Sequence, residues 1–194
     1  SDEVGAGYSV LRELCFVWFL HRLKIEVIDT PKLLEKVVLS TWTRGIKRYK
    51  NFREYRISSK DGRILVKGSA VWLFYDLNKK RIARVPDDIS ERYESEDLIN
   101  FEQELDSWET CGMIEPEKQM NLTLRYADFD TNGHVNNTQY VGFFESLFHE
   151  AAKNGDEKIK ELYIRFAREI DRNKKEIQLG IKQQGTEWQC NIFN

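Results

Sequence analysis

The segment from Arg125 to Tyr140 carries a dense group of polar side chains between two apolar stretches of chain. Upstream, residues 120–126 alternate apolar and polar side chains, which is the period of a strand with one buried face. Downstream, apolar residues recur at a spacing of three and four from Tyr140 to Ala152, as on one face of a helix. The polar residues therefore occupy a loop that leaves a strand and opens a helix, where free backbone N–H groups favour developing negative charge.

Two carboxylates, one imidazole and three carboxamides lie in this loop: Asp128, Asp130, His134, Asn132, Asn136 and Asn137. A purely structural explanation is a capped helix start, with Asn136 or Asn137 as the N-cap and the aspartates complementing the helix dipole. That explanation leaves the histidine without a role. The residue types alone keep a capped helix and a functional site open as alternatives.

Metal and nucleophile motifs fit the loop poorly. Residues 128–133 match the opening of a calcium-binding EF-hand loop, but the twelfth position holds Gln139 where a bidentate glutamate is needed. The EF-hand also requires a preceding helix, whereas 120–126 alternates like a strand. The three histidines share no zinc-ligand spacing, and no G-x-S-x-G motif marks a nucleophilic serine. We therefore expect neither a metal nor a cofactor.

The rest of the chain predicts helices packed against antiparallel strands, an α+β arrangement. Helical spacing predicts a helix over residues 8–23, and Asp61-Gly62 predicts a tight hairpin turn. Alternation predicts strands over residues 23–28, 36–42, 50–57, 64–77, 120–126, 162–169, 176–182 and 187–193.

Residues 87–118 interrupt this pattern with an acidic segment. They hold 12 acidic and 2 basic side chains, which leaves 28 bases against 20 acids, a net charge of +8, in the rest of the chain. We interpret the segment as a linker between two domains, with one short helix near 96–105. The positive remainder favours an acidic partner. A pI near 6.0 and the lack of a nucleic-acid motif argue against nucleic acid.

The cysteines and the hydropathy predict a cytoplasmic protein. Cys15, Cys111 and Cys190 form no motif and make an odd count, which is typical of reduced thiols. No secretory signal is recognisable, and the longest apolar run, residues 14–20, is too short to span a bilayer, so no membrane association is expected.

The loop resembles the signature of the acyl-acyl carrier protein thioesterases, the bacterial and plant-plastid enzymes that release fatty acids from the carrier. Residues 126–140 read Tyr-Ala-Asp-Phe-Asp-Thr-Asn-Gly-His-Val-Asn-Asn-Thr-Gln-Tyr. The family pattern is roughly aromatic-S-D-x-D-x-N-x-H-V-N-N-x-x-Y, from which this chain departs mainly by Ala127 in place of serine. Segments 22–26, 41–46 and 70–77 also have family counterparts, so the resemblance covers most of the chain.

The resemblance implies two tandem hotdog domains, each an antiparallel sheet wrapped around a central helix. Residues 1–86 would form the first, with the acyl-chain pocket; 87–118 would be the linker, and 119–194 would form the second, with the catalytic residues. Family members begin with a strand and helical turns ahead of the first residues here and end with a strand beyond Phe193. We therefore expect the first hotdog to be incomplete at its N-terminus.

Four catalytic residues follow by position from the family. The aspartate, asparagine and histidine fall on Asp130, Asn132 and His134, and the glutamate, in a strand of the second hotdog, falls on Glu169. Thioester hydrolysis needs an activated water or a carboxylate nucleophile, and donors for the oxyanion. We expect Glu169 to act as base or nucleophile, held by His134, with Asp130 orienting the imidazole. Asn132, with backbone N–H groups near Asn136, would hold the carbonyl oxygen.

The resemblance also implies a substrate pocket and a partner. Some plant members carry a cysteine beside the glutamate, and Ile170 takes that place here, so no thiol is expected in the chemistry. Ordinary core packing is the alternative role for the apolar members of the expected substrate-binding set. That set is Cys15, Phe16, Trp18 and Phe19 on the first helix, Trp72 and Phe74 on a strand, and Asn136 and Asn137.

The implied partner is an acyl carrier protein bearing a fatty acyl chain, whose acidic surface suits the net charge of +8 outside the linker. A homodimer is left open. Two other functions also remain: a hotdog thioesterase acting on acyl-coenzyme A, and a hotdog protein that binds acyl groups without hydrolysing them.

Overall fold

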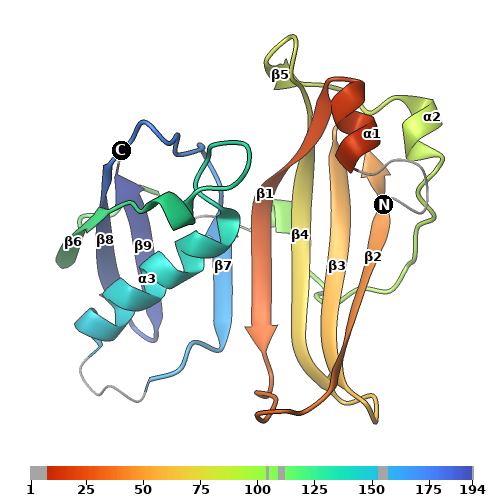
Figure 1. Ribbon diagram of the computed structural model, residues 1–194. Coiled ribbons are helices and arrows are strands. Elements are labelled where there is room, and N and C mark those ends of the chain that lie inside the picture. Colours follow the sequence, from red (N-terminus) through yellow and green to blue (C-terminus); the bar gives the residue numbers. More distant parts are fainter. Residues whose placement is uncertain (1–7, 104, 109–111, 153–156, 194) are drawn as a thin grey trace. The chain divides into compact units, whose positions relative to one another are not determined.

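The computed structural model describes residues 8–103, 105–108, 112–152 and 157–193. Contacts divide the chain into two compact units (Figure 1). Unit 1 comprises Ser1–Trp108 and Ile159–Phe166, and unit 2 comprises Glu109–Lys158 and Ala167–Asn194. In the described residues, each unit is an antiparallel sheet with few helices, which confirms the α+β class.

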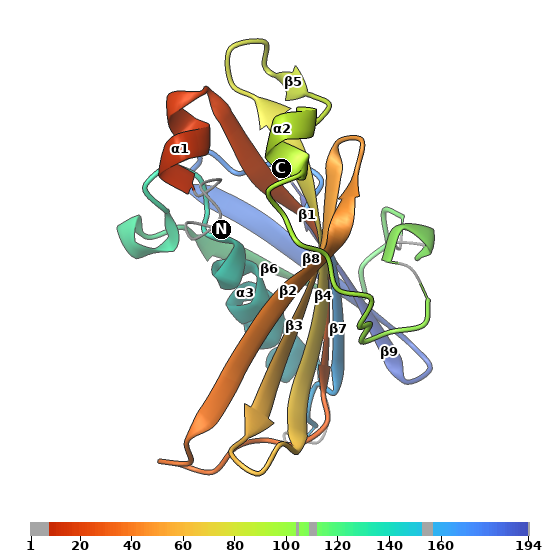
Figure 2. The same ribbon diagram turned by 90° about the vertical axis from the view of Figure 1, so that its right-hand side faces the viewer.

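Unit 1 is built on one long antiparallel sheet, in the order β2-β3-β4-β1-β7 with β5 paired to β4. Figure 2 shows β2, β3 and β4 running side by side and twisting together. Gly62, at φ 89°, closes the predicted hairpin turn between β3 and β4. The strands are β1 (Phe16–Val27), β2 (Val37–Lys47), β3 (Lys50–Ser59), β4 (Ile64–Asp76), β5 (Arg81–Ile82) and β7 (Glu161–Arg165).

The helix predicted over residues 8–23 is wrong beyond its first turns. Helix α1 spans Tyr8–Glu13, Cys15 takes a φ of 61°, and β1 begins at Phe16. Trp18 then pairs with Phe74 across the β1–β4 ladder. Aromatic and β-branched side chains favour a strand. The same apolar positions also satisfy the helical spacing, so periodicity could not separate the two structures.

The two short helices of unit 1 lie at the same end of its sheet (Figures 1 and 2). Leu11 of α1 and Ile89 of α2 (Asp87–Ser90) form a buried cluster with Phe74 and Val85. This cluster is the core at that end of the unit.

Part of the segment predicted as a linker, residues 95–103 and 105–108, crosses the sheet of unit 1 as an extended strap. The helix expected near 96–105 is wrong, because 97–103 are non-helical and only a 3-10 turn, η1 (Leu105–Ser107), follows. The indole N–H of Trp42 donates to the Leu98 carbonyl at 2.8 Å. Arg22 Nη1 donates to the carbonyls of Leu105 and Trp108 at 2.9 and 2.8 Å. Main-chain carbonyls of the strap thus find their partners on the sheet.

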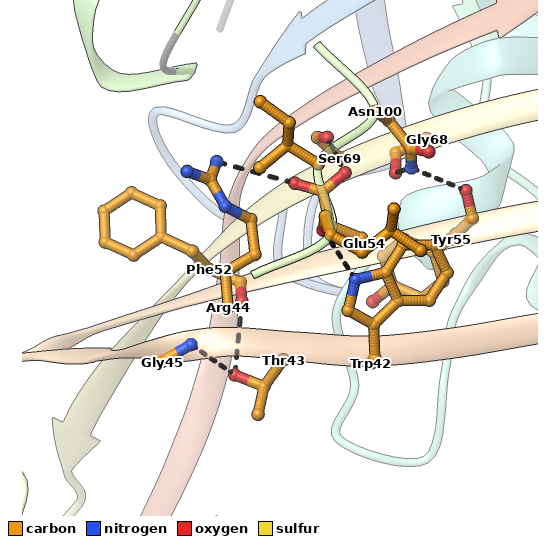
Figure 3. Close-up of polar contacts among 12 residues, drawn as sticks. Trp42, Thr43, Arg44, Gly45, Phe52, Glu54, Tyr55, Gly68, Ser69 and Asn100 are labelled. Atoms are coloured by element: carbon orange, nitrogen blue, oxygen red, sulfur yellow. Dashed lines mark hydrogen bonds and ion pairs between the residues drawn. The ribbon is translucent and has the colours of Figure 1, made fainter. Parts of the chain in front are cut away.

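A buried carboxylate lies on the same part of the sheet (Figure 3). Glu54 is 2% exposed, lies 3.7 Å from Arg44 Nη1 and accepts a hydrogen bond from the Ser69 hydroxyl. The Asn100 amide of the strap donates to the Gly68 carbonyl at 2.9 Å. The Glu54 carboxylate and the Asn100 amide are therefore both paired, as most buried polar groups are.

Strand β7 was expected in the second domain, but its contacts place it in unit 1. It pairs with β1 from Arg22↔Arg165 to Glu26↔Glu161. Arg22 also donates to the Tyr163 hydroxyl at 2.8 Å. The strand predicted over 162–169 ends at Arg165, so Glu169 lies in the loop that follows and not in a strand.

Unit 2 packs one long helix against a three-stranded sheet of order β6-β8-β9. The predicted helical face is confirmed: Phe143, Leu147 and Phe148 are buried, as are alternate residues of β8 such as Leu179 and Ile181. The elements are β6 (Lys118–Thr123), the 3-10 turn η2 (Tyr126–Asp128), α3 (Asn137–Ala151), β8 (Glu176–Gln184) and β9 (Glu187–Phe193).

No helix within the described residues is long and apolar enough to cross a membrane. Cys15 and Cys190 are free thiols, and Cys111 lies outside the described residues.

Candidate active site

The polar loop folds on itself between β6 and α3. Asp128 is fully buried, and its carboxylate accepts hydrogen bonds from the backbone N and Nη2 of Arg125 at 2.7 and 2.8 Å. Burial alone would raise the pKa of Asp128, but the Arg125 bonds outweigh it and hold the pKa below its ordinary value. The Asp128 carbonyl accepts the N–H of Asn136 at 2.8 Å. Asp128 is therefore an anchor for the loop.

The tip of the loop is a tight turn closed by Asp130. Its N–H donates to the His134 carbonyl at 2.8 Å, and Gly133, at φ 82°, donates back to the Asp130 carbonyl at 3.1 Å. The Asp130 carboxylate accepts the N–H groups of Asn132 and His134 at 2.8 and 3.2 Å, and lies 3.5 Å from the Asn132 amide. Asp130 was expected to orient and charge the imidazole. Its hydrogen bonds instead go to the backbone and amide of the turn that carries His134.

Main-chain pairing brings a distant segment to this turn. The N–H of Val135 donates to the Ile170 carbonyl, and the N–H of Arg172 donates to the Gly133 carbonyl, both at 2.9 Å. His134 and Asp171 lie opposite each other as an isolated antiparallel β-bridge, which these two hydrogen bonds form. Two stretches that are distant in the sequence thus lie side by side through backbone hydrogen bonds.

This pairing places Glu169 against His134. Glu169 Oε2 lies 3.3 Å from His134 Nε2, with the side chains 48% and 30% exposed. Burial raises the pKa of Glu169, the His134 imidazole lowers it, and the nearby Asp130 charge raises it again, for a net shift upward. The result is a half-buried carboxylate–imidazole pair that is open to solvent on one side.

The two asparagines at the start of α3 differ in role. Asn136 is the N-cap, and its side-chain oxygen accepts the N–H of Thr138 at 3.0 Å. Asn137 is the first residue of the helix and is exposed. Asn136 therefore caps the helix, as the structural explanation predicted, and the same loop also places His134 against Glu169.

The remaining expected substrate-binding residues all lie in unit 1. Phe16 and Trp18 pack on Phe74 at ring-centroid distances of 4.8 and 4.9 Å. The neighbouring Phe19 packs on Tyr75 at 4.8 Å.

The other two expected residues of unit 1 are Cys15 and Trp72. Cys15 forms the turn before β1, and the Trp72 indole donates to the Tyr55 hydroxyl at 3.2 Å. Of all these residues, only Phe74 is fully buried.

Sequence reasoning missed two features of the site. Tyr140 was assigned to the apolar face of α3 and to the family motif without a role of its own, whereas burial and the charge of Glu169 raise its pKa to about 12. A polar hollow of about 280 Å³ also lies beside the loop, lined by Thr131, Asn132, Gly133, Asp171, Arg172 and Asn173. No pattern in the sequence marked this hollow, because its lining combines residues 131–133 with residues 171–173.

A metal centre is not formed by the described residues, which hold no group of three or more His, Cys, Asp or Glu side chains placed to bind an ion. The antiparallel α+β units and the paired glutamate and histidine define a protein with a carboxylate–imidazole site. Models of the acyl-ACP thioesterase N-terminal and C-terminal domains match residues 1–93 and 113–192. The chain belongs to the acyl-ACP thioesterase family.

Individual relatives agree with this membership. The chloroplastic acyl-[acyl-carrier-protein] hydrolase FATB3 of Cuphea viscosissima is 26% identical over 148 residues, covering 71% of this chain and 35% of the relative. The chloroplastic oleoyl-acyl carrier protein thioesterase 1 of Arabidopsis thaliana is 26% identical over 152 residues, covering 74% of this chain and 42% of the relative. The chain thus spans well under half the length of these two proteins.

The fold is shared with a solved structure. An acyl-ACP thioesterase from Bacteroides thetaiotaomicron superposes with a TM-score of 0.81 at 23% identity, covering 98% of this chain and 76% of that one.

Proposed function

We propose that this protein hydrolyses the thioester of fatty acyl-acyl carrier protein, which releases the free fatty acid and ends chain elongation. The observation that carries the proposal is the 3.3 Å contact between Glu169 and His134. Membership of the family and the printed names of the relatives support the substrate class.

Glu169 suits the role of a general base. Its raised pKa strengthens it as a proton acceptor, and the pair is open to a water molecule on its exposed side. The oxygen of that water would add to the thioester carbon while a proton passes to Glu169. Collapse of the tetrahedral intermediate would break the C–S bond, and the departing thiolate would take up the proton. Direct attack by the Glu169 carboxylate is the alternative first step: it would form a mixed anhydride and expel the thiolate, and water would then hydrolyse the anhydride and restore Glu169. Both routes consume one water and give a fatty acid and a free carrier thiol.

The oxyanion would be held by donors of the same loop. Asn132 lines the polar hollow, and α3 begins at Asn137, where the positive end of the helix dipole lies. Asp130 would act by fixing the turn that presents both Asn132 and His134. Removing one such donor typically costs about 10²–10³ in rate.

We further propose that the chain is a tandem of hotdog domains, 1–86 and 119–194, joined by 87–118. The helix of unit 2 packed on an antiparallel sheet supports the second hotdog. The apolar face of unit 1 that carries Phe16, Trp18 and Phe74 supports an acyl-chain pocket in the first. The net charge of +8 outside 87–118 supports docking of an acidic carrier, which should weaken as salt rises. The free thiols support a reducing compartment such as the cytoplasm.

The test is release of free fatty acid from a panel of acyl-carrier substrates by the wild type and by Glu169→Ala. The exposed Glu187 of β9 offers a matched control, Glu187→Ala, which should keep full activity. Normal turnover by Glu169→Ala would reject the assignment. The same acyl groups on coenzyme A separate the two enzyme functions by relative turnover. Retention of the acyl ligand without hydrolysis would indicate a binding protein.

A further inference from the structure

Tyr140 of α3 reaches the segment that carries Glu169. It lies in the first turn of the helix, half-buried, with its ring 6.3 Å from that of Phe143. The backbone N–H of Ile170 donates a hydrogen bond to the Tyr140 hydroxyl oxygen. The phenol is thus attached to the residue that directly follows the catalytic carboxylate.

Both backbone groups of Ile170 are therefore held. Its carbonyl accepts from Val135 at 2.9 Å and its N–H donates to Tyr140, while its side chain is only 3% exposed. One bond comes from the loop that presents His134, and the other comes from the helix. Glu169 directly precedes Ile170 and lies outside any strand, so the nearest backbone hydrogen bonds shown to fix its segment are these two.

The charged and titratable groups around Glu169 are consistent with this arrangement. His134 and Asp130 face it from the loop, and Tyr140 faces it from α3. Burial and the Glu169 charge raise the pKa of Tyr140 to about 12. The phenol therefore stays neutral near pH 7 and adds no second negative charge beside the carboxylate.

We propose that Tyr140 is a positioning residue, which holds the Glu169–Ile170 backbone so that the carboxylate stays in its half-buried place against His134. The inference rests on the proposed function, because it assigns Tyr140 a part in the same reaction. A small displacement of a reacting group from its productive position lowers the reaction rate. Loss of the phenol oxygen should therefore lower turnover through Glu169 and leave substrate binding unchanged.

The test is Tyr140→Phe, which removes one oxygen and keeps the ring. Loss of one neutral hydrogen bond predicts a fall in kcat of about 3- to 10-fold with KM unchanged. A carboxylate freed into solvent loses the burial that raises its pKa, so the acid limb of the pH–rate profile should move to lower pH. A role in packing alone would leave that limb in place. Circular dichroism of both proteins confirms that rates are compared per folded molecule.

Tyr126→Phe is the matched control, because Tyr126 is 90% exposed in the same loop and should show neither effect. In a Glu169→Gln background, Tyr140→Phe should cause no further loss of the residual rate, since both changes act through one carboxylate. An unchanged kcat and acid limb in Tyr140→Phe, with Glu169→Ala inactive, would overturn this inference alone. Full activity of Glu169→Ala would instead overturn the proposed function.

Discussion

Replacing Asp128 by asparagine should destabilise the protein by about 2 kcal/mol and leave the folded molecule active. Asp128 is 0% exposed, and its carboxylate accepts the backbone N–H of Arg125 at 2.7 Å and Nη2 at 2.8 Å. The Arg125 side chain is 74% exposed, so the ion pair contributes only about 0–1 kcal/mol. The backbone bond to a buried charge contributes about 1.5–3 kcal/mol, of which asparagine recovers part through its carbonyl oxygen.

The pH dependence of this difference gives a second check. The folded pKa of Asp128 lies below its ordinary value of 3.8. A depressed folded pKa adds stability above the unfolded pKa, and that stability is lost as the pH falls through the folded pKa. The wild type should therefore exceed Asp128→Asn by a constant amount from about pH 5 to pH 8, and by less as the pH falls below about 4.

Urea unfolding of both proteins at neutral and acid pH measures the difference. Asp97→Asn, the same change at an exposed carboxylate, should stay within about 0.5 kcal/mol of the wild type. A loss below about 0.5 kcal/mol for Asp128→Asn at pH 7, or a loss that persists undiminished at acid pH, would refute the anchoring role.

Three further outcomes are expected. Gly180→Ala should cost about 1–3 kcal/mol of unfolding free energy in urea, because an added Cβ would lie 2.7 Å from the Phe193 ring and 2.8 Å from Pro116, whereas Gly112→Ala should be neutral. Burial raises the pKa of Glu169 above its ordinary value of 4.5, and activity is lost when this base is protonated. The midpoint of the acid limb of the kcat/KM pH profile should therefore lie above pH 4.5, and a midpoint at or below 4.5 would contradict the assignment. Glu54→Gln should lower the unfolding free energy by about 1–3 kcal/mol, because it removes a buried charge that pairs with Arg44 and Ser69. A lower thermal midpoint would measure this loss, and an unchanged midpoint would show that the pairing does not stabilise the fold.

The local elements of the site could be predicted from the sequence. Alternation before Tyr126 and helical spacing after Tyr140 gave the strand, the loop and α3, and the loop composition marked a polar cluster within which only the family resemblance singled out Asp130, Asn132 and His134. The strand and helix predictions needed only periods of two and 3.6 residues. The strand–loop–helix order therefore followed from local pattern.

The contact with Glu169 could not be predicted from pattern alone. It depends on backbone bonds between 133–135 and 170–172, and such bonds leave no trace in side-chain spacing. Only the resemblance to a family suggested the pair. The strand predicted to reach Glu169 ends at Arg165, the last residue that pairs with β1.

Two predictions of helix in unit 1 were wrong. Residues 16–19 fit helical and strand spacing equally, and only the register opposite Phe74 decides between them. The helix predicted near 96–105 is instead the extended strap. The carbonyls of the strap and the Asn100 amide are bonded to the sheet, through partners that include Trp42 and Arg22.

The β-bridge between His134 and Asp171 joins backbone groups, so the side chains of this segment can be substituted without loss of the pairing. Positions 170 to 172 meet the loop through amide and carbonyl groups that every non-proline residue possesses, and Ile170 turns its side chain into the interior. Side chains there can diverge among relatives, and a thiol can be exchanged for a hydrocarbon, while the distance between base and imidazole is preserved. Gly133 is the exception, since its φ of 82° and the Arg172 guanidinium 3.3 Å from where a Cβ would stand leave little room for any other residue.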